Sequence, residues 1–157
     1  MRALPWLLTL VLAGCFMANT SPAKKIGDTV HDLNDNARWG RISDAALLVD
    51  ASYRNTFVHA HQAWGNEIQL ADTEIVNVQI APDAEHANAI VNYSWYAMDT
   101  MTLHETTVRQ RWSAVSGGYA LMSEAVVKGD PRLLATEDKK KPASPDDELS
   151  SMPALAD

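Results

Sequence analysis

The chain of 157 residues is 46% hydrophobic and 21% charged, a length and composition typical of one modest globular domain. Its 13 basic and 20 acidic side chains give a formal net charge of −7 with neutral histidines. Non-specific binding to nucleic acid needs clustered Lys and Arg that displace counterions, so this balance argues against a nucleic-acid partner.

The first residues have the pattern of an export signal. Arg2 supplies a positive charge, and residues 3–11 are apolar apart from Thr9. Residues 12–15 read Leu-Ala-Gly-Cys, which resembles the bacterial lipobox, where cleavage precedes Cys15 and its thiol carries a diacylglycerol. One alternative is a transmembrane anchor, but crossing the hydrocarbon core takes about 20 apolar residues and this run is shorter. The other is a secreted protein cleaved elsewhere.

Cys15 is the only cysteine of the chain, which excludes an intrachain disulfide. Lipid attachment accounts for an unpaired thiol in an exported protein, and three acyl chains anchor stably where a single chain is marginal. Phe16 rather than Asp follows the cysteine. Similarity to enterobacterial sorting therefore predicts the outer membrane, with the protein facing the periplasm.

Proline positions divide the chain, because only Pro82 lies between residues 23 and 130. The end of the chain is polar with few large apolar residues, so it cannot offset its ordering entropy and we expect it to be disordered. We expect four segments, namely a signal peptide, a lipid-anchored linker, an α+β domain and a polar tail: 1–14, 15–26, 27–135 and 136–157.

The first half of the domain predicts helices. Residues 28–39 have apolar side chains at helical spacing, from an N-cap at Asp28 to a stop at Gly40. Ser43 can cap a short turn through 44–48. From there apolar side chains recur at intervals of 4, 4, 3 and 4, which predicts a longer helix: Val49, Tyr53, Phe57, Ala60 and Trp64.

The second half is predicted to be extended, because apolar and polar side chains alternate in four segments: 68–80, 87–97, 107–114 and 119–127. Ile75 is out of step, which indicates a bulge near 71–74. Turns are expected at 82–85 and at 116–118. Helices followed by a meander of strands predict an α+β fold in which the longer helix covers a curved antiparallel sheet.

Short motifs spread over residues 29–131 carry a family resemblance. They read Asn-Asp-Asn-Ala-Arg-Trp-Gly-Arg-Ile-Ser-Asp-Ala-Ala at 34–46, with further matches at 49–50, 54–57, 72–75, 109–112 and 118–119. In these positions the chain resembles the NTF2-like (cystatin-like, SnoaL-like) superfamily, in particular its small bacterial lipoproteins. The resemblance implies a cone with a highly bent sheet, often hollow and frequently dimeric through the sheet. Relatives include enzymes, transport factors and assembly modules, so the fold alone licenses no function.

His59 and His61 suggest a metal pair, but on a helix residues i and i+2 point about 200° apart and cannot share one ion. No second cysteine or HExxH pattern supplements them. We interpret both as surface or rim histidines, expect no metal or cofactor, and assign no role to His31, His86 or His104.

An enzyme of the SnoaL or ketosteroid-isomerase kind would move protons beside a carbonyl inside the cone, as the resemblance implies. Five residues offer suitable groups: Asp50, Asp72, Tyr53, Tyr93 and Tyr96. Asp50 lies where a helix N-cap is needed and Asp72 lies near a strand bend, so both have structural explanations. No spacing fixes a base against an electrophilic partner, so we assign no catalytic residue.

Seven aromatic residues could line a cavity for a small apolar ligand or fill the core: Trp39, Tyr53, Phe57, Trp64, Trp95, Trp112 and Tyr119. Core packing is the preferred interpretation for a chain of this size. Arg109 and Arg111 alternate with Gln110 and Trp112, which point inward, so the arginines project from the opposite sheet face as candidate interface residues.

These features together predict a non-enzymatic outer-membrane lipoprotein that binds or scaffolds another envelope protein, or a second copy of itself, through its sheet face. Two alternatives stay open: binding of a small apolar ligand in the cone, and a SnoaL-like or ketosteroid-isomerase-like enzyme. A cavity lined by unpaired polar groups would favour the alternatives, whereas a filled cone with an exposed apolar sheet face would favour the binding module.

Overall fold

A computed structural model describes residues 21–134, so Cys15, the predicted signal peptide and the predicted polar tail lie outside the described residues. The elements follow one another along the chain as α1 (Pro22–Arg38), α2 (Ile42–Ala45), η1 (Ala46–Leu48), α3 (Arg54–Ala60), β1 (Ile68–Ile80), β2 (His86–Ala97), β3 (Thr102–Val115), β4 (Gly118–Gly129) and η2 (Pro131–Leu133). Between residues 21 and 134, no helix has the length and apolar character needed to cross a membrane.

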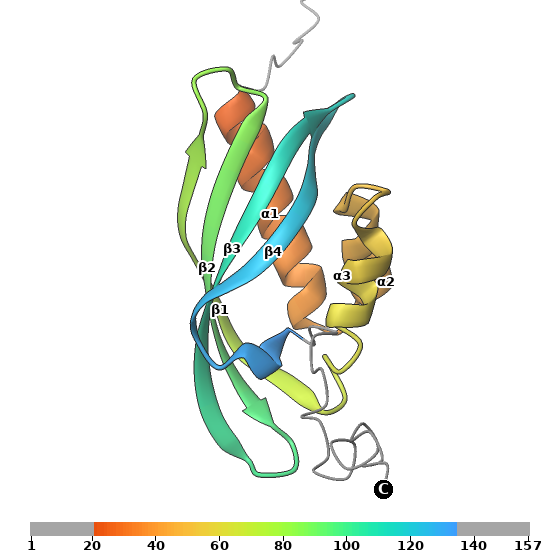
Figure 1. Cartoon of the computed structure of the whole chain (residues 1–157), viewed down its shortest axis with the longest axis vertical. Helices are drawn as coiled ribbons and strands as arrows, with labels where there is room; N and C mark the ends of the chain where they lie inside the picture. The colour runs from red at the N-terminus through yellow and green to blue at the C-terminus, as the bar shows by residue number, and fades with distance from the viewer. Residues whose placement is uncertain (1–20, 135–157) are drawn as a thin grey trace, which may run out of the picture.

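The four strands form one antiparallel sheet in the order β1-β2-β3-β4. The sheet is long and strongly twisted, and the helices lie along one of its faces, with α1 running beside the strands (Figure 1). The expected fold class is confirmed: an α+β fold with N-terminal helices packed on a curved antiparallel sheet. The opposite sheet face carries no element of the described chain.

The first helix begins earlier than the sequence pattern indicated. Ser21 accepts a hydrogen bond from the backbone N–H of Lys24 at 3.3 Å, and Pro22 occupies the first turn, where its fixed φ suits a helix. Ile26 is fully buried in the core. The end of the expected linker is therefore part of the packed domain, because this proline starts a helix instead of marking a boundary.

The longer helix expected from Val49 onward is mostly absent. Val49 has extended backbone and forms a parallel bridge with Leu121, and helical structure resumes only in α3. The carboxylate of Asp50 accepts hydrogen bonds from the backbone N–H and hydroxyl of Ser52 at 2.9 and 2.6 Å. Such a local turn competes with helix formation, so α1 is the long helix that covers the sheet.

Strand β1 contains two register shifts where one was expected. The first leaves Ala71 unpaired, as the alternation predicted, and the second leaves Val76 unpaired between Ile75 and Asn77. Val76 is therefore 52% exposed, whereas Ile75 packs against the core. Each bulge adds one residue and reverses the side-chain phase after it.

The space between helices and sheet is filled. Five of the seven candidate aromatic residues are buried there: Phe57, Trp64, Trp95, Trp112 and Tyr119. Tyr53 is half-buried. Trp39 is 62% exposed, because it follows the last residue of α1 and its indole N–H donates to the nearby Asp35 carboxylate at 3.2 Å. Trp39 is therefore not a cavity-lining residue.

Candidate functional site

A cluster of polar side chains lies inside the helix–sheet interface. We call it the buried cluster, and it takes one residue from α1, one from the end of α3 and one from each of the inner strands and β4: Asn34, His61, Tyr93, Gln110 and Glu124. All five side chains are sealed from solvent. Buried polar groups are costly unless they find partners, so their hydrogen bonds decide what the cluster does.

Gln110 joins most of the buried cluster. Its side-chain amide donates to Asn34 Oδ1 at 3.0 Å and to Glu124 Oε1 at 3.1 Å, and it lies 3.3 Å from the hydroxyl of Tyr93. In return the Asn34 amide donates to Gln110 Oε1 at 3.2 Å. The Tyr93 hydroxyl donates to Asn34 Oδ1 through a short hydrogen bond. Three strands and α1 are thereby linked across the core.

His61 and Glu124 form the ionisable part of the buried cluster. Their Nε2 and Oε2 atoms lie 3.3 Å apart, and each side chain is 1% exposed. His61 Nδ1 lies 2.7 Å from the Phe57 carbonyl oxygen, an acceptor, so Nδ1 carries a hydrogen. A favourable contact between Nε2 and Oε2 then requires one further proton on either atom, because two lone pairs would otherwise face each other. Glu124 Oε2 has no other partner among the described residues.

Burial raises the pKa of the Glu124 carboxyl, and the opposing effects of His61 and of the Gln110 hydrogen bond only reduce that rise. Burial also raises the pKa of Tyr93 well above its ordinary value, with a further contribution from Glu124. The Tyr53 hydroxyl accepts a hydrogen bond from the Glu124 backbone N–H at 3.2 Å, and burial raises its pKa to about 12. Both tyrosines are therefore neutral in this setting.

The interpretation of His61 as a surface or rim residue is wrong. α3 ends at Ala60, and the next residue turns its ring into the core, where it lies 4.1 Å from the Phe57 ring and 4.4 Å from the Trp64 ring between centroids. His59 is exposed, so the two histidines do not meet at one site.

Glu124 is a residue that the alternation pattern missed. Counted from Leu121, regular alternation would place it on the outer face, but a bulge at Met122 reverses the phase so that Glu124 pairs with Gln110 on the inner face. One signal was present: Val126, which shares the phase of Glu124, is apolar.

A second region is open to solvent. This groove lies at the end of the sheet where β2 and β3 are joined, the lower end in Figure 1, and has a volume of about 930 Å³. It is lined by residues from the α3–β1 connection, the ends of β1 and β2, and η2: Gln62, Ala63, Asn66, Glu67, Ile68, Trp95, Ala97, Met98, Asp99 and Arg132. We call it the end groove.

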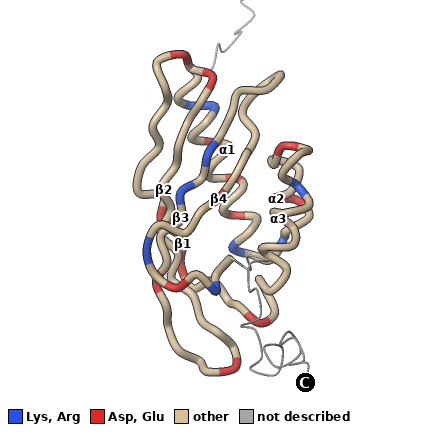
Figure 2. Tube along the Cα trace, viewed as in Figure 1, with Lys and Arg blue, Asp and Glu red and all other residues tan. Residues whose placement is uncertain are grey.

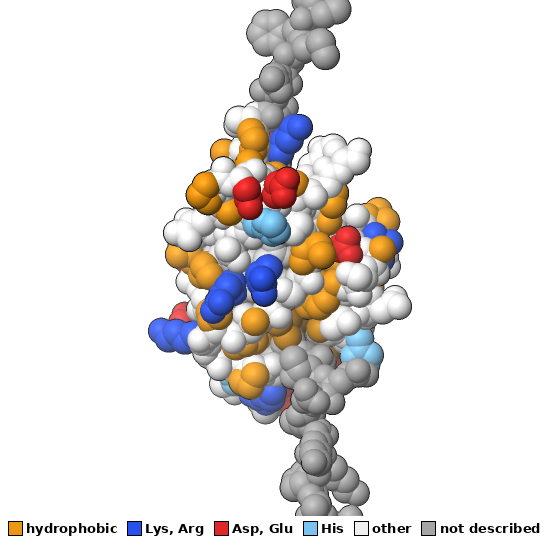
Figure 3. Space-filling view, turned by 45° about the horizontal axis from the view of Figure 1, so that its top comes forward, with side chains coloured by type: hydrophobic (Ala, Val, Ile, Leu, Met, Phe, Trp, Pro, Cys, Tyr) orange, Lys and Arg blue, Asp and Glu red, His pale blue; other side chains and the backbone are white. Residues whose placement is uncertain are grey.

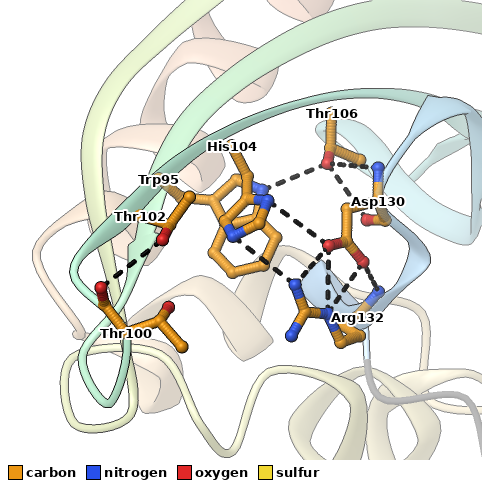
Figure 4. A network of polar contacts seen from close by, with 7 residues as sticks. All are labelled: Trp95, Thr100, Thr102, His104, Thr106, Asp130 and Arg132. Atoms are coloured by element: carbon orange, nitrogen blue, oxygen red, sulfur yellow. Dashed lines mark hydrogen bonds and ion pairs between the residues drawn. The ribbon is translucent and has the colours of Figure 1, made fainter.

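Two residues that line the end groove, Trp95 and Arg132, belong to a stack of three side chains with His104 (Figure 4). Trp95 lies against His104, with ring centroids 4.5 Å apart, and the Arg132 guanidinium lies 6.0 Å from the Trp95 ring. The indole N–H of Trp95 donates to Thr106 Oγ1 at 3.1 Å. Thr106 also holds the backbone of Asp130, accepting from its N–H at 3.2 Å and donating to its carbonyl at 3.0 Å.

Asp130 fixes the guanidinium of Arg132. Arg132 Nε lies 3.1 and 3.0 Å from the two carboxylate oxygens, and Nη2 donates to Oδ2 at 2.6 Å. His104 Nδ1 lies 3.4 Å from the same oxygen. Hydrogen bonding by Arg132 lowers the pKa of Asp130, and the same contact raises the pKa of Arg132. The ion pair therefore has little net charge.

Arg109 and Arg111 are exposed on the outer sheet face, as the alternation predicted. Arg109 is flanked by Ile90 and Ala125 on the neighbouring strands. Farther along the same face, a shallow hollow of about 340 Å³ has acidic and polar lining: Asp72, Glu74, Asn92, Tyr93, Ser94, Glu105, Thr106, Thr107, Lys128 and Gly129. The outer face is thus polar and carries both signs of charge, so it is not the exposed apolar sheet face that would favour the binding module.

The other candidate acids have structural partners. Asp72 is exposed and lies 3.3 Å from Arg38 in an ion pair. Hydrogen bonds from Ser52 lower the pKa of Asp50. Tyr96 is half-buried on β2. The structure brings none of these three groups to the buried cluster or to the end groove.

One group of described residues has the donor atoms for a metal: Asp83, Glu85 and His86 in the β1–β2 turn, all exposed. The Asp83 carboxylate already accepts backbone hydrogen bonds from Glu85 and His86 at 2.8 and 3.3 Å. Figure 3, which brings this end of the molecule forward, shows acidic and histidine side chains side by side on an open surface. Exposed acidic turns of this kind are common without an ion, so we assign no metal to it.

Comparisons with known proteins add little. No protein-family model matches the chain, and no curated protein matches it. A solved structure that is similar in part is the intermembrane space region of chloroplast protein ARC6, which is 11% identical. The match covers 68% of this chain and 97% of that one, with a TM-score of 0.44. At this level the similarity does not bear on function.

Proposed function

We propose that the chain is a lipid-anchored, non-enzymatic module of the bacterial outer membrane that binds or scaffolds another envelope protein through the outer face of its sheet. The observation that carries this proposal is the uncovered sheet face. It exposes Arg109 and Arg111 on rigid strands, with acidic side chains farther along the same surface. Strands place the Cα positions of a binding site more precisely than loops do, which favours specific recognition. A complementary partner would have acidic groups opposite the two arginines.

The interior supports binding over catalysis. The groups that could transfer protons, His61 and Glu124, are each 1% exposed and contact each other. A general base must lie within hydrogen-bond reach of its substrate, and here no substrate reaches it without opening the core. The filled helix–sheet interface likewise leaves little room for a small apolar ligand within the cone.

Membrane attachment rests on the sequence around Cys15. We expect Cys15→Ser to move the protein from the membrane fraction to the soluble fraction and to abolish labelling by a fatty-acid probe. Membrane fractionation and metabolic labelling measure the two effects. Labelling that survives the substitution would contradict the lipoprotein assignment, whatever the sheet face binds.

The sheet-face proposal is tested by crosslinking in living cells. A photo-crosslinking residue at Asn88, which pairs with Arg111 on the outer face, should give a specific adduct, whereas one at His31 on α1 should not. Adding Arg109→Glu and Arg111→Glu to the Asn88 crosslinker should remove the adduct. An adduct of twice the monomer mass would identify a second copy as the partner. Equal adducts from both positions, or adducts insensitive to charge reversal, would overturn the proposal.

A further inference from the structure

The end groove combines features that neither the sheet face nor the buried cluster has. It is open, partly apolar and rimmed by carboxylates, and it lies at the opposite end of the molecule from the start of α1 (Figure 1). Within it, Ala97 and Met98 offer apolar surface. A surface of this composition fits a side chain with an apolar stem and a charged tip.

The charge of the end groove is set by Glu67 and Asp99. Among the described residues, Arg132 is the single cation that lines it, and three contacts of 2.6–3.1 Å with Asp130 already compensate its charge. Glu67 and Asp99 are exposed. The β2–β3 turn is acidic in Figure 2 as well, which agrees with the position of Asp99. The free charge of the groove is therefore negative.

The backbone holds the two carboxylate-bearing segments together. The N–H of Met98 donates to the Glu67 carbonyl at 2.8 Å, so the α3–β1 connection is tied to the end of β2. The turn after Met98 is closed by N–H groups of Thr100 and Met101 that donate to the Ala97 carbonyl at 3.2 and 2.8 Å. Both rim carboxylates are therefore carried by segments that hydrogen bonds fix in place.

The turn beside the end groove adds exposed apolar side chains. Met98 and Met101 are exposed at the end of the β2–β3 hairpin. Methionine side chains adapt to different apolar partners, and exposed apolar groups next to a groove mark interaction surfaces. Because the rim is acidic, an anionic lipid surface is a poor partner for this end.

From these observations we infer that the end groove is a second docking site, which binds a peptide segment of a partner protein carrying Lys or Arg beside large apolar residues. The cation would lie between Glu67 and Asp99, with its stem on Ala97 and Met98. Apolar neighbours in the peptide would pack on Met101. This site is separate from the proposed sheet-face interface, and it does not depend on lipid attachment.

The test uses the full exported chain with Cys15→Ser and short synthetic peptides. The basic probe is acetyl-Ala-Leu-Lys-Leu-Lys-Leu-Ala-amide, and two control peptides carry Gln or Glu in place of Lys. We expect the basic peptide to bind most tightly in calorimetry. In NMR spectra it should shift the amide signals of Asp99 and Met101 and leave those of Arg109 unchanged. Equal affinity for the Gln peptide, or shifts centred on Arg109, would overturn the inference.

Charge reversal locates the site. Glu67→Lys with Asp99→Lys should weaken binding of the basic peptide about tenfold. Each exposed charge contact contributes a small free energy of binding, and charge reversal both removes this attraction and replaces it with repulsion. The matched control is Asp83→Lys with Glu85→Lys, which makes the same charge change at the other end of the sheet and should leave affinity unchanged. Equal weakening by both double variants would show non-specific attraction and overturn the site.

The chain has its own basic run at Lys139–Lys141, a few residues beyond Arg132 in sequence. Replacing these three lysines with Glu distinguishes an occupant within the chain from an external one. With an external partner, peptide affinity and the amide signals of Asp99 and Met101 stay unchanged. A several-fold rise in peptide affinity, together with shifts of those signals without peptide, would show that the chain fills its own groove and would overturn the proposed partner.

Discussion

The buried cluster and the stack beside the end groove contain the same kinds of side chain in opposite settings. Each pairs a histidine with a carboxylate next to tryptophan, but His61 and Glu124 are 1% exposed whereas His104 and Asp130 are 20% and 21% exposed. Burial raises the pKa of Glu124, while Arg132 lowers that of Asp130. Environment therefore decides whether a histidine–carboxylate pair links elements of the core or supports a surface.

Removing one member of the buried pair should have the largest effect. His61→Ala leaves the Glu124 carboxyl buried without its partner, and breaking such a pair costs about 3–5 kcal/mol of unfolding free energy. The matched change in the open pair, His104→Ala, should cost roughly 1 kcal/mol or less, because that pair is partly solvated. Chemical denaturation measures both. Similar losses of unfolding free energy for the two variants would contradict the contrast between the buried pair and the partly solvated pair.

Gly129 sets the position of Asp130 beside the end groove. Its φ is +95°, and a Cβ there would lie 2.2 Å from the Glu105 carbonyl oxygen. Gly129→Ala should therefore cost between about 1 and 3 kcal/mol of unfolding free energy, from backbone strain and the clash together. Gly117→Ala is the control, since Gly117 has a similar φ of +92° but open space around it. Thermal unfolding should show a smaller loss for Gly117→Ala, and equal losses would mean that φ alone accounts for the effect.

Gln110 tests whether the buried cluster depends on satisfied hydrogen bonds. Gln110→Leu keeps a similar volume but removes the donor to Asn34 and Glu124, so unfolding free energy should fall by about 1–3 kcal/mol. The neighbouring change on the outer face, Arg111→Leu, should stay within about 0.5 kcal/mol. Urea titrations of the two variants measure both changes in unfolding free energy. A neutral result for Gln110→Leu would show that its partners find other hydrogen bonds.

The two carboxyl groups predict opposite pH dependences. The raised pKa of Glu124 means that the folded state holds the carboxyl proton more tightly than the unfolded state does. The stability that the protonated carboxyl contributes is therefore fully present below its ordinary pKa of 4.5. It is lost as pH rises through the folded pKa. The lowered pKa of Asp130 contributes stability above its ordinary value of 3.8, which is lost as pH falls through the folded pKa.

Glu124→Gln separates these contributions. Relative to the native chain, this variant should gain stability as pH rises above about 4.5, because it no longer carries an ionisable group in the core. Asp130→Asn should lower stability at pH values above about 3.8, and its difference from the native chain should shrink as pH falls below that value. Unfolding midpoints measured across pH give both curves. A parallel pH curve for Glu124→Gln and the native chain would contradict the role of the buried carboxyl.

Local patterns were sufficient for the fold class and insufficient for the buried cluster. Alternation along β3 correctly placed Gln110 and Trp112 inward and Arg109 and Arg111 outward. Periodicity failed at Val49, where a turn held by side-chain hydrogen bonds replaces a helix. A pattern counts residues at fixed intervals and does not detect such competition.

The end groove could not be read from one stretch of sequence. Trp95 and His104 face each other because β2 and β3 pair, and Arg132 joins them from a turn that follows β4. Asp130 depends on Gly129 and on Thr106, residues whose proximity appears only when the sheet forms. Contacts across the sheet, and not local spacing, create this surface.

Met122 is the extra residue of the bulge in β4 that precedes Glu124. It has no partner on β3, because Leu121 pairs with Trp112 and Ser123 pairs with Arg111. Losing one residue from a strand ordinarily exchanges its two faces. Here a shortened β4 without Met122 would restore plain alternation and still turn Glu124 inward. Removal of this one residue should therefore be almost silent for the interior, so chains of different length at this point can share the same buried carboxyl.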